Sequence, residues 1–239
     1  MQVQELLYEG KAKKIYKTEQ DNILLMEFKD SLTAFNALKK GEFAGKGRIN
    51  CKISTLIFKL LSQHNIKHHW IETRDNKYMR VHKTKIIPLE VVIRNYIAGS
   101  LSKKLNIEEG TPLKQAVIEF YYKDDALSDP FVNDEQILAL GWAKSEDLAQ
   151  LKTQALEINR ILLNTFNHIG LKLIDFKIEF GVDSTGKIIL SDEISPDCMR
   201  LWDKVTNEKM DKDRFRRDLG SVEQAYLEVY ERLSKGVTL

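Results

Sequence analysis

The stretch Leu171–Asp197 (LKLIDFKIEFGVDSTGKIILSDEISPD) decides the fold, because it predicts two strands joined by a turn and followed by a carboxylate-rich tail. Its first half alternates apolar residues with charged ones, which stand at odd positions: Asp175, Lys177 and Glu179. Successive side chains on a strand point to opposite faces, so these three charges share one face of the predicted strand. The polar run Asp183–Gly186 predicts the turn.

The register across this turn decides which charged side chains meet. If Ser184 and Thr185 form its centre, Lys177 faces Asp192 across the hairpin, although a one-residue bulge would change that pairing. In this register Glu179 and Asp192 approach one cation, with Lys177 beside them. Such hard oxygen ligands suit magnesium better than zinc. The alternative is a solvated outer face that carries a surface ion pair.

The composition of the chain is that of an ordinary globular protein. Its 239 residues are enough for one large domain or two closely packed lobes. Lys and Arg number 37 against 35 Asp and Glu, and the net charge of +2 argues against a general nucleic-acid or membrane binder. Cys51 and Cys198 form no close-spaced ligand motif, and residues 1–14 carry no apolar signal core. We therefore expect reduced thiols and a cytoplasmic protein.

Residues 4–29 predict a small unit of three strands whose first turn is cationic. That turn, Glu9–Lys14 (EGKAKK), combines Gly10, which allows a tight backbone, with three lysines. Backbone N–H groups and ammonium groups together suit a polyphosphate. The turn lacks the second glycine and the Gly-Lys-Ser/Thr ending of a Walker A loop, and the alternative is a solvated hairpin tip.

The segment Lys85–Ser100 predicts a buried strand, because it is rich in β-branched residues. Arg94 inside that strand needs an anionic partner, since burying an unpaired charge is costly. The partner is open at this point: Glu90, another internal acid, or the phosphate or carboxylate of a ligand, which a guanidinium binds through two parallel bonds. Ala98–Ser100 allows the chain to turn closely and offers a hydroxyl and backbone N–H groups to the same anion.

Three segments predict scaffold helices. Apolar residues at helical spacing run through residues 49–61, 145–168 and 222–233. Ser145 and Ser221 are the expected N-caps of the second and third helix, and Gln224 would complete a capping box with Ser221.

Two other segments predict loops. Residues 30–48 are glycine-rich, and within them Gly45–Arg48 either cradles an anion or only connects elements. Residues 118–133 predict a strand that runs into an acid-rich loop beginning at Lys123.

Together these pieces indicate magnesium-nucleotide chemistry beside a second anionic substrate. A cationic turn, paired carboxylates and an arginine near a small-residue turn offer the positioning and charge neutralisation that phosphoryl transfer requires. No Ser/His/Asp triad or catalytic cysteine pattern is visible, which disfavours covalent catalysis. The residues alone therefore indicate an ATP-using transferase or ligase and do not name its substrates.

Long motifs also follow one another along nearly the whole chain: Tyr8–Lys13, Pro88–Ser100, Lys123–Leu127, Leu173–Gly181, Asp192–Asp197 and Arg200–Asp203. In residue content and order they resemble the SAICAR synthetase (phosphoribosylaminoimidazole-succinocarboxamide synthase) family of purine biosynthesis. The resemblance implies an ATP-dependent ligase. Such an enzyme joins L-aspartate to the carboxylate of carboxyaminoimidazole ribonucleotide (CAIR) and gives SAICAR, ADP and phosphate through an acyl phosphate.

The same resemblance implies an α+β fold of two lobes, related to the ATP-grasp enzymes. We expect mostly antiparallel sheets with flanking helices, and ATP in the cleft between the lobes. Residues 1–84 are expected to form the ATP-binding lobe, and residues 85–239 the lobe that contributes the substrate and metal site.

The functional residues of the family carry over to matching positions of this sequence. ATP phosphates are expected at Gly10, Lys11, Ala12 and Lys13, with Lys123 near the nucleotide. Magnesium is expected at Glu179 and Asp192. The ribonucleotide phosphate is expected at Arg94 and Ser100, with Arg200 near it. Asp175 and Lys177 are expected to contact the substrate near the reacting centre. The segments Ser31–Asn36 and Lys46–Ser54 are candidates for the aspartate pocket.

The resemblance further implies Mg²⁺ as cofactor, the small-molecule substrates ATP, L-aspartate and CAIR, and a cytoplasmic homodimer with neither nucleic-acid nor membrane partners. Two rival functions stay open. One is a different ATP-using ligase or small-molecule kinase with the same cleft, and the other is a nucleotide- or RNA-binding module.

Overall fold

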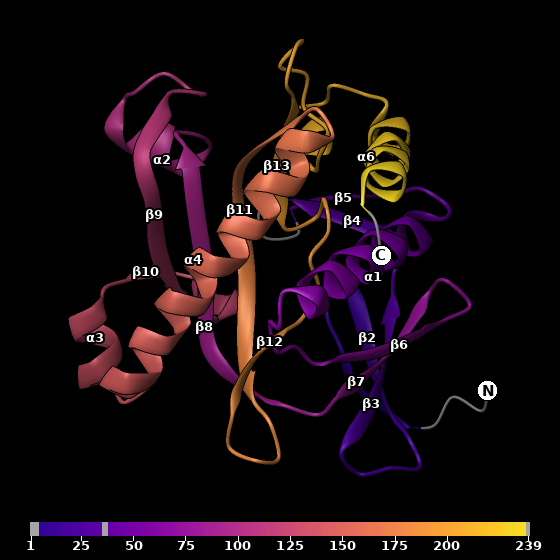
Figure 1. The fold of residues 1–239 in the computed structure, drawn as a ribbon, viewed down its shortest axis with the longest axis vertical. Coiled ribbons are helices and arrows are strands. Elements are labelled where there is room, and N and C mark those ends of the chain that lie inside the picture. The colour runs from indigo at the N-terminus through magenta and orange to yellow at the C-terminus, as the bar shows by residue number, and fades with distance from the viewer. Residues whose placement is uncertain (1–4, 35–37, 238–239) are drawn as a thin grey trace.

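The computed structural model describes residues 5–34 and 38–237 and has the expected α+β architecture. Helices flank two large sheets (Figure 1), and every named strand pairing in the described residues is antiparallel. The helices are α1 (Lys46–Gln63), α2 (Ser100–Leu105), η1 (Asp125–Leu127, a 3₁₀ turn), α3 (Asp134–Ala139), α4 (Ser145–His168), α5 (Asp213–Arg216) and α6 (Val222–Gly236). None of them is long and apolar enough to cross a membrane.

The first sheet is built from the N-terminal part of the chain in the order β1-β2-β3-β7-β6. Its strands are β1 (Leu6–Glu9), β2 (Lys13–Lys17), β3 (Ile23–Phe28), β6 (Trp70–Arg74) and β7 (Tyr78–His82). The predicted three-strand unit is confirmed, with Asp21 and Asn22 in the turn between β2 and β3. Helix α1 packs against β3 and β6 and buries the apolar stripe that includes Ile53, Ile57 and Leu61.

The second sheet has the order β10-β9-β8-β11-β12, and β13 also pairs with β11. Its strands are β8 (Lys85–Tyr96), β9 (Pro112–Tyr122), β10 (Phe131–Val132), β11 (Leu171–Val182), β12 (Ile188–Ser191) and β13 (Met199–Asp203). Strands β8 and β11 pair along most of their length, which places Arg94 opposite Asp175 and Glu90 opposite Glu179. Helix α4 packs against β8, β9 and β11 and buries the predicted stripe that includes Leu151, Ile158 and Leu162.

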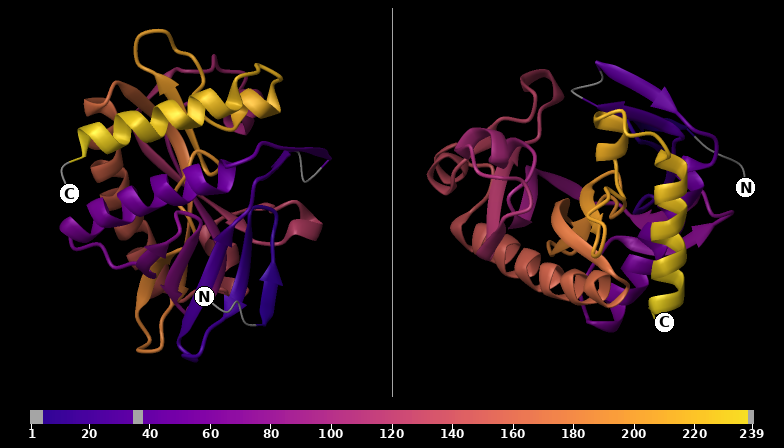
Figure 2. Two further views of the ribbon diagram at one scale, coloured as in Figure 1. Left: turned by 90° about the vertical axis from the view of Figure 1, so that its right-hand side faces the viewer. Right: turned by 90° about the horizontal axis from the view of Figure 1, so that it is seen from above.

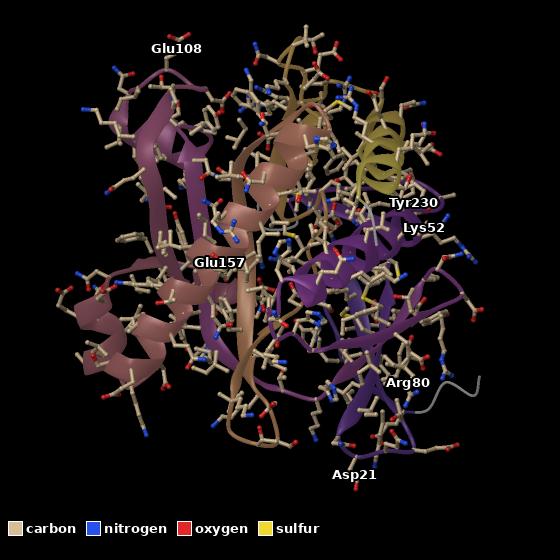
Figure 3. The ribbon with its side chains drawn as sticks, viewed as in Figure 1. Asp21, Lys52, Arg80, Glu108, Glu157 and Tyr230 are labelled. Atoms are coloured by element: carbon tan, nitrogen blue, oxygen red, sulfur yellow. The ribbon has the colours of Figure 1, made fainter. Side chains whose placement is uncertain are left out.

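Helices α1 and α6 lie side by side on the outside of the molecule (Figure 2). Tyr226, Val229 and Leu233 of α6 are buried and join the same hydrophobic core as α1 and α4. At the outer surface of the pair, the Lys52 ammonium lies 5.1 Å from the centre of the Tyr230 ring (Figure 3). Helix α1 therefore contacts both the first sheet and α6.

The prediction of a loop over residues 30–48 is wrong in part. Strands β4 (Ser31–Ala34) and β5 (Lys39–Glu42) pair in a separate two-stranded sheet, and α1 already begins at Lys46. The Asp30 carboxylate accepts hydrogen bonds from the backbone N–H groups of Gly45 (3.1 Å) and Gly47 (2.8 Å). An internal carboxylate thus occupies the anion cradle predicted at Gly45–Arg48.

The predicted N-cap of α4 is wrong, whereas that of α6 is confirmed in position but lacks the predicted capping box. The N-cap of α4 is Lys144, whose N–H group donates to the Asp147 carboxylate, so that Ser145 is the first helical residue. Ser221 does precede α6, but it has a φ of +49° and its side chain makes no cap hydrogen bond. The start of α4 therefore has a local side-chain bond from Asp147, whereas the start of α6 has none from Ser221.

The register predicted for the β11–β12 hairpin is wrong by one residue. Asp183 exchanges backbone hydrogen bonds with Lys187 and Gly186 (2.9 and 3.0 Å), and the Asp183 carboxylate accepts from the N–H groups of Thr185 and Lys187. This closes a five-residue loop, with Gly186 at a φ of +84°. Glu179 therefore lies opposite Ser191, and Lys177 does not face Asp192.

Candidate active site

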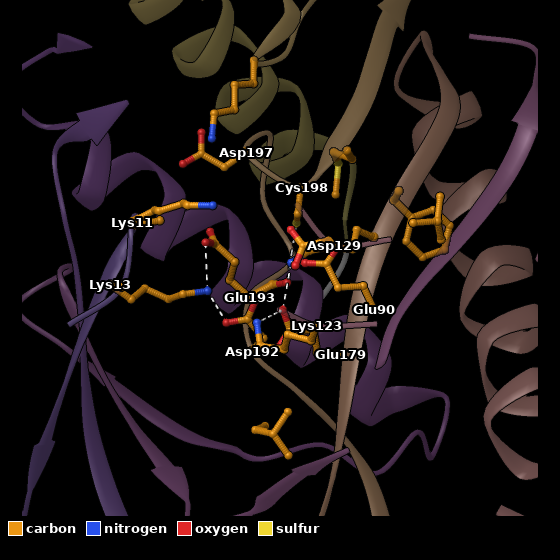
Figure 4. A pocket seen from close by; sticks show the side chains of 18 of the residues that line it. Lys11, Lys13, Glu90, Lys123, Asp129, Glu179, Asp192, Glu193, Asp197 and Cys198 are labelled. Atoms are coloured by element: carbon orange, nitrogen blue, oxygen red, sulfur yellow. Dashed lines mark hydrogen bonds and ion pairs between the residues drawn. The ribbon is translucent and has the colours of Figure 1, made fainter. Parts of the chain in front are cut away.

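A cavity of about 750 Å³ lies between the two large sheets (Figure 4) and is lined by all but one of the predicted site residues. Part of its wall is apolar and comes from both sheets: Ile15, Leu24, Met26, Ile86 and Val92. The rest is strongly charged. The alternative of a solvated outer face for β11 is excluded, because Asp175 and Glu179 are each only 3% exposed.

One group of charges, called here the lysine cluster, contains three lysines and four carboxylates: Lys13, Lys123, Lys177, Glu90, Glu179, Asp192 and Glu193. Lys13, at the start of β2, donates to the Asp192 carboxylate, and its ammonium lies 3.1 Å from Glu193 Oε1. Burial opposes the charged form of Lys13, but Asp192 and Glu193 outweigh it and raise the lysine pKa. The ion pair is therefore fully charged near neutral pH.

Asp192 is held in place by its backbone. It follows β12 with a φ of +62°, a left-handed conformation that Asp tolerates better than most residues. His69 Nε2 lies 2.8 Å from the Asp192 carbonyl oxygen. Burial lowers the pKa of His69 to about 4, so the ring is neutral near pH 7 and its Nε2–H group donates to this carbonyl.

Glu179 and Lys177 form the centre of the lysine cluster. Glu179 Oε1 accepts hydrogen bonds from Lys123 Nζ (2.9 Å) and Lys177 Nζ (2.8 Å), and Lys177 also donates to Glu90 Oε1 (2.7 Å). Burial opposes the charge of Lys177, but Glu179 and Glu90 hold its pKa well above the usual value. Burial likewise opposes ionisation of Glu179, yet Lys177 and Lys123 lower its pKa.

The donor chemistry of this cluster fits a magnesium ion. Glu179 and Asp192 point into the same cavity (Figure 4), and each directs only one of its carboxylate oxygens to a lysine. Within residues 5–34 and 38–237 no group of three or more His, Cys, Asp or Glu side chains forms a closed metal cage. Magnesium is commonly bound by one or two carboxylates together with substrate phosphates, which is the arrangement that two such carboxylates allow.

The second group of charges, called here the arginine cluster, is centred on Asp175. Its two oxygens accept from Arg94 Nη1 (2.8 Å) and Arg200 Nη1 (2.9 and 3.0 Å). Arg94 also donates to Glu119 (2.7 Å), and Arg200 Nε donates to Asp213 (2.9 Å). The anionic partners of Arg94 are therefore internal acids, while Glu90 pairs with Lys177 instead.

Both guanidinium groups reach the turn between β8 and α2. Arg94 Nη2 lies 3.3 Å from Ser100 Oγ. Gly99 has a φ of +58°, and a Cβ atom there would lie 2.5 Å from Arg200 Nη2, so only glycine allows this close approach. The Gly99 N–H group donates to Glu109, which Arg217 also binds through two nitrogens (2.8 and 2.5 Å). Ser100 is the predicted site residue that does not line the cavity itself.

The cationic turn between β1 and β2 forms one edge of the cavity. Gly10, Lys11 and Ala12 line it together with Lys13. Lys11 Nζ donates to the Asp125 carboxylate (2.7 Å) from the acid-rich loop after β9. This contact joins the β1–β2 turn to the loop after β9, which begins at Lys123.

The candidate aspartate segments have different positions. Thr33 and Ala34 of β4 line the cavity, whereas residues 35 and 36 lie outside the described residues. The Lys46 ammonium forms an ion pair with Asp197, and Ser54 Oγ donates to the Ile194 carbonyl oxygen (3.0 Å). Both side chains are therefore bonded to other groups of the protein. Cys51 is buried, and burial raises its pKa to about 12.

Sequence reasoning missed several acids that hold the predicted cations: Glu90 on Lys177, Glu119 on Arg94, Glu193 on Lys13 and Asp213 on Arg200. Glu119 gave the same signal as Arg94, since it is a charge inside an apolar strand. Asp213 gave no signal, because its role depends on where a short helix after β13 places it.

Known proteins resemble this chain over nearly its full length. The model of the SAICAR synthetase family matches residues 6–233. The phosphoribosylaminoimidazole-succinocarboxamide synthase of Campylobacter fetus is 58% identical over 98% of this chain and 99% of its own length. The crystal structure of the enzyme of that name from Ehrlichia chaffeensis is 44% identical, with a TM-score of 0.95 over 98% of this chain and 100% of the other. A SAICAR synthetase in complex with ADP is also 44% identical, with a TM-score of 0.93 over the same shares.

Proposed function

The chain belongs to the SAICAR synthetase family of ATP-dependent ligases, and we propose that its own reaction joins L-aspartate to the carboxylate of CAIR. The products are SAICAR, ADP and phosphate. The observation that carries the proposal is that one cavity contains the lysine cluster and the arginine cluster side by side. Strand β11 supplies both, with Glu179 and Lys177 in the first and Asp175 in the second.

The nucleotide is assigned to the side of the cavity formed by the first sheet. The apolar wall formed by Leu24 and Met26 of the first sheet, together with Ile86 of the second sheet, suits the adenine ring. The turn with Gly10, Lys11, Ala12 and Lys13 offers backbone and ammonium donors to the phosphates, and Lys123 faces it from the second sheet. The complex of a 44% identical SAICAR synthetase with ADP supports a nucleotide in this fold.

Glu179 and Asp192 would hold a magnesium ion, which when bound supplies positive charge that screens the nucleotide phosphates from an approaching carboxylate. The lysines already bonded to these two carboxylates fix their positions. Lys13 orients Asp192, whereas Lys123 and Lys177 orient Glu179. Such partners keep a ligand group in the geometry that binding requires.

The ribonucleotide phosphate is assigned to the arginine cluster. Arg94, Arg200 and Ser100 converge on one turn and offer planar guanidinium groups and a hydroxyl. Both oxygens of Asp175 are engaged by these arginines, so its role in the proposal is to orient the two guanidinium groups near the substrate.

The reaction proceeds in two steps. An oxygen of the CAIR carboxylate attacks the γ-phosphorus of ATP, and the bond between that phosphorus and ADP breaks. The aspartate amine then attacks the carbonyl carbon of the acyl phosphate, phosphate leaves with its bridging oxygen, and the nitrogen loses a proton to give the amide. Lys177, which carries full positive charge between Glu90 and Glu179, is placed to stabilise the charge that develops on the transferred group.

An assay of ADP release tests this reaction and its rivals. With ATP and Mg²⁺ present, we expect ADP release only when L-aspartate and CAIR are both added, with one SAICAR formed per ADP. Release that does not depend on aspartate would identify a kinase and contradict the ligase. No ADP release together with salt-sensitive RNA binding would favour the nucleic-acid-binding alternative.

The proposal includes the organisation of the chain and its assembly. Residues 1–84 form the nucleotide lobe and residues 85–239 the substrate and metal lobe, a division that the separate composition of the two large sheets supports.

A homodimer is expected, since closed two-fold dimers are the commonest oligomers. Light scattering on the purified protein tests it. The free thiols of Cys51 and Cys198 support a cytoplasmic location.

A further inference from the structure

The lysines and arginines that line the cavity are, with one exception, held by carboxylates. Lys11, Lys13, Arg94, Lys123, Lys177, Arg200 and Arg216 each form an ion pair with an Asp or Glu side chain. The exception is Lys212, whose ammonium forms no hydrogen bond or ion pair with any residue in the described ranges. It is a cation in a site where the other cations have internal partners.

The backbone of Lys212 is fixed beside the other charges of the cavity. Lys212 is the N-cap of α5, and its N–H group donates to the Pro196 carbonyl (3.2 Å). Asp197 is the acid that acts most strongly on its ammonium, but Asp197 already accepts from Lys46 and from the Tyr226 hydroxyl (2.8 Å). The acid that acts most strongly on Lys212 is therefore already bonded to two other donors.

The surroundings of Lys212 link the two clusters. Its ammonium is acted on by Arg216, which pairs with Asp213 beside the arginine cluster, and by Glu193, which belongs to the lysine cluster. Burial lowers the pKa of Lys212, with Asp197 the main opposing charge, so a further anion beside it would stabilise the charged form. A third substrate that attacks between the nucleotide and the ribonucleotide has to bind at such a position.

We propose that the Lys212 ammonium binds a carboxylate of L-aspartate. The inference rests on the proposed function. The cations assigned above bind the nucleotide and the ribonucleotide, and none of them is assigned to L-aspartate. Lys212 lines the cavity and supplies that cation. A dicarboxylic amino acid needs such a cation, because its negative charges must be neutralised while its amine stays free to attack.

Steady-state kinetics on three variants test this role. Lys212→Met removes the charge and keeps most of the side-chain volume, Lys212→Arg keeps the charge, and Lys204→Met is the control. Lys204 is exposed, lies eight positions earlier and donates to Asn167 (2.6 Å) outside the cavity. The Michaelis constant is measured separately for L-aspartate, ATP and CAIR, with thermal unfolding as the check of folding.

We expect Lys212→Met to raise the KM for L-aspartate about 10-fold to 100-fold, which is the loss of one charge-assisted hydrogen bond. The KM values for ATP and CAIR should stay within about twofold, and Lys212→Arg should recover part of the loss. An increase confined to the KM for CAIR, or a fall in kcat at low pH with an unchanged KM for aspartate, would overturn the proposal. Wild-type ADP release that depends on aspartate keeps the proposed function intact in either case.

Discussion

At the scale of single residues, the lysine and arginine side chains that line the cavity are paired with side chains of opposite charge, with Lys212 as the exception described above. One oxygen of Glu179 accepts from two lysines, and the residue lies opposite Glu90 on the neighbouring strand. Burial alone would raise the pKa of such an acid, and the lysines are what keep it ionised. Its charge is therefore available for binding a cation.

Replacing Glu179 by Gln should abolish turnover and leave the fold intact. The substitution keeps the shape of the side chain, and Lys177 retains Glu90 as a partner. We expect kcat to fall more than about 100-fold, since even the outer partners of a metal ligand are worth about 10- to 100-fold. Glu157→Gln, on the exposed side of α4 (Figure 3), is the matched control. A Glu179→Gln enzyme with wild-type kcat would contradict the magnesium role.

His69 should make stability depend on pH. Its pKa is about 4 in the folded protein against an ordinary 6.5, so below pH 6.5 the unfolded chain binds a proton that the folded protein does not. Stability from this residue is complete above pH 6.5 and falls progressively toward pH 4, by about 3 kcal/mol in total.

Urea unfolding of wild type and His69→Gln between pH 4 and 7.5 measures this effect. Only the difference between the two proteins isolates His69, because Asp211 acts with the opposite sign. Burial and Asp213 raise the pKa of Asp211 to about 7, so its contribution is lost as the pH rises. The wild-type advantage should shrink as the pH falls below 6.5. An advantage that is independent of pH would show that His69 is not a buried neutral ring.

A single charge inside an apolar strand correctly predicts that this charge has a partner of opposite sign. Arg94 was predicted to need an anion, and it has Asp175 and Glu119. The identity of each partner could not be predicted, because it depends on which strands are neighbours and in what register. Lys212 gave no signal at all, since a lysine in a charged segment is ordinarily solvated.

At the scale of elements, the alternation of β11 predicted which residues share a face, and the structure confirms it. The register with β12 was wrong, because the Asp183 carboxylate closes a five-residue loop that the turn composition did not reveal. The strand pair β4–β5 was missed for a similar reason, since glycine-rich polar segments predict loops even where a short hairpin forms. The long helices were found because their periodic stripes extend over many turns.

The turn between β8 and α2 should depend on Gly99. In Gly99→Ala a methyl group would meet Arg200 Nη2 at 2.5 Å, and Arg200 has little freedom to move because Asp175 and Asp213 hold it. We expect the KM for CAIR to rise about 10-fold or more, with the KM for ATP nearly unchanged.

Gly186→Ala is the control for backbone strain. Gly186 also has a positive φ, of +84°, but a Cβ atom added there would meet no other atom within 4 Å, because the β11–β12 loop is open at this point. Both variants should lose about 1–3 kcal/mol of stability. If Gly186→Ala changes the KM for CAIR as much as Gly99→Ala does, the effect of Gly99 is strain rather than displacement of Arg200.

At the scale of the whole molecule, the site exists only because two sheets from different parts of the chain face each other. Lys13 comes from the first sheet and Asp192 from the end of β12, and the two meet across the cavity (Figure 4). Periodicity and composition predict the elements but not which faces of two sheets meet. The order of long motifs along the chain, through its resemblance to a family, supplied that information.

The transfer of oxygen from CAIR to phosphate distinguishes the acyl-phosphate route from any route in which phosphate leaves ATP without bonding to CAIR. CAIR labelled with ¹⁸O in its carboxylate is converted with ATP, Mg²⁺ and L-aspartate, and the phosphate product is analysed by mass spectrometry. Since the acyl phosphate loses phosphate by cleavage of its carbon–oxygen bond, we expect one ¹⁸O atom in each phosphate released. Unlabelled phosphate formed together with SAICAR would contradict it.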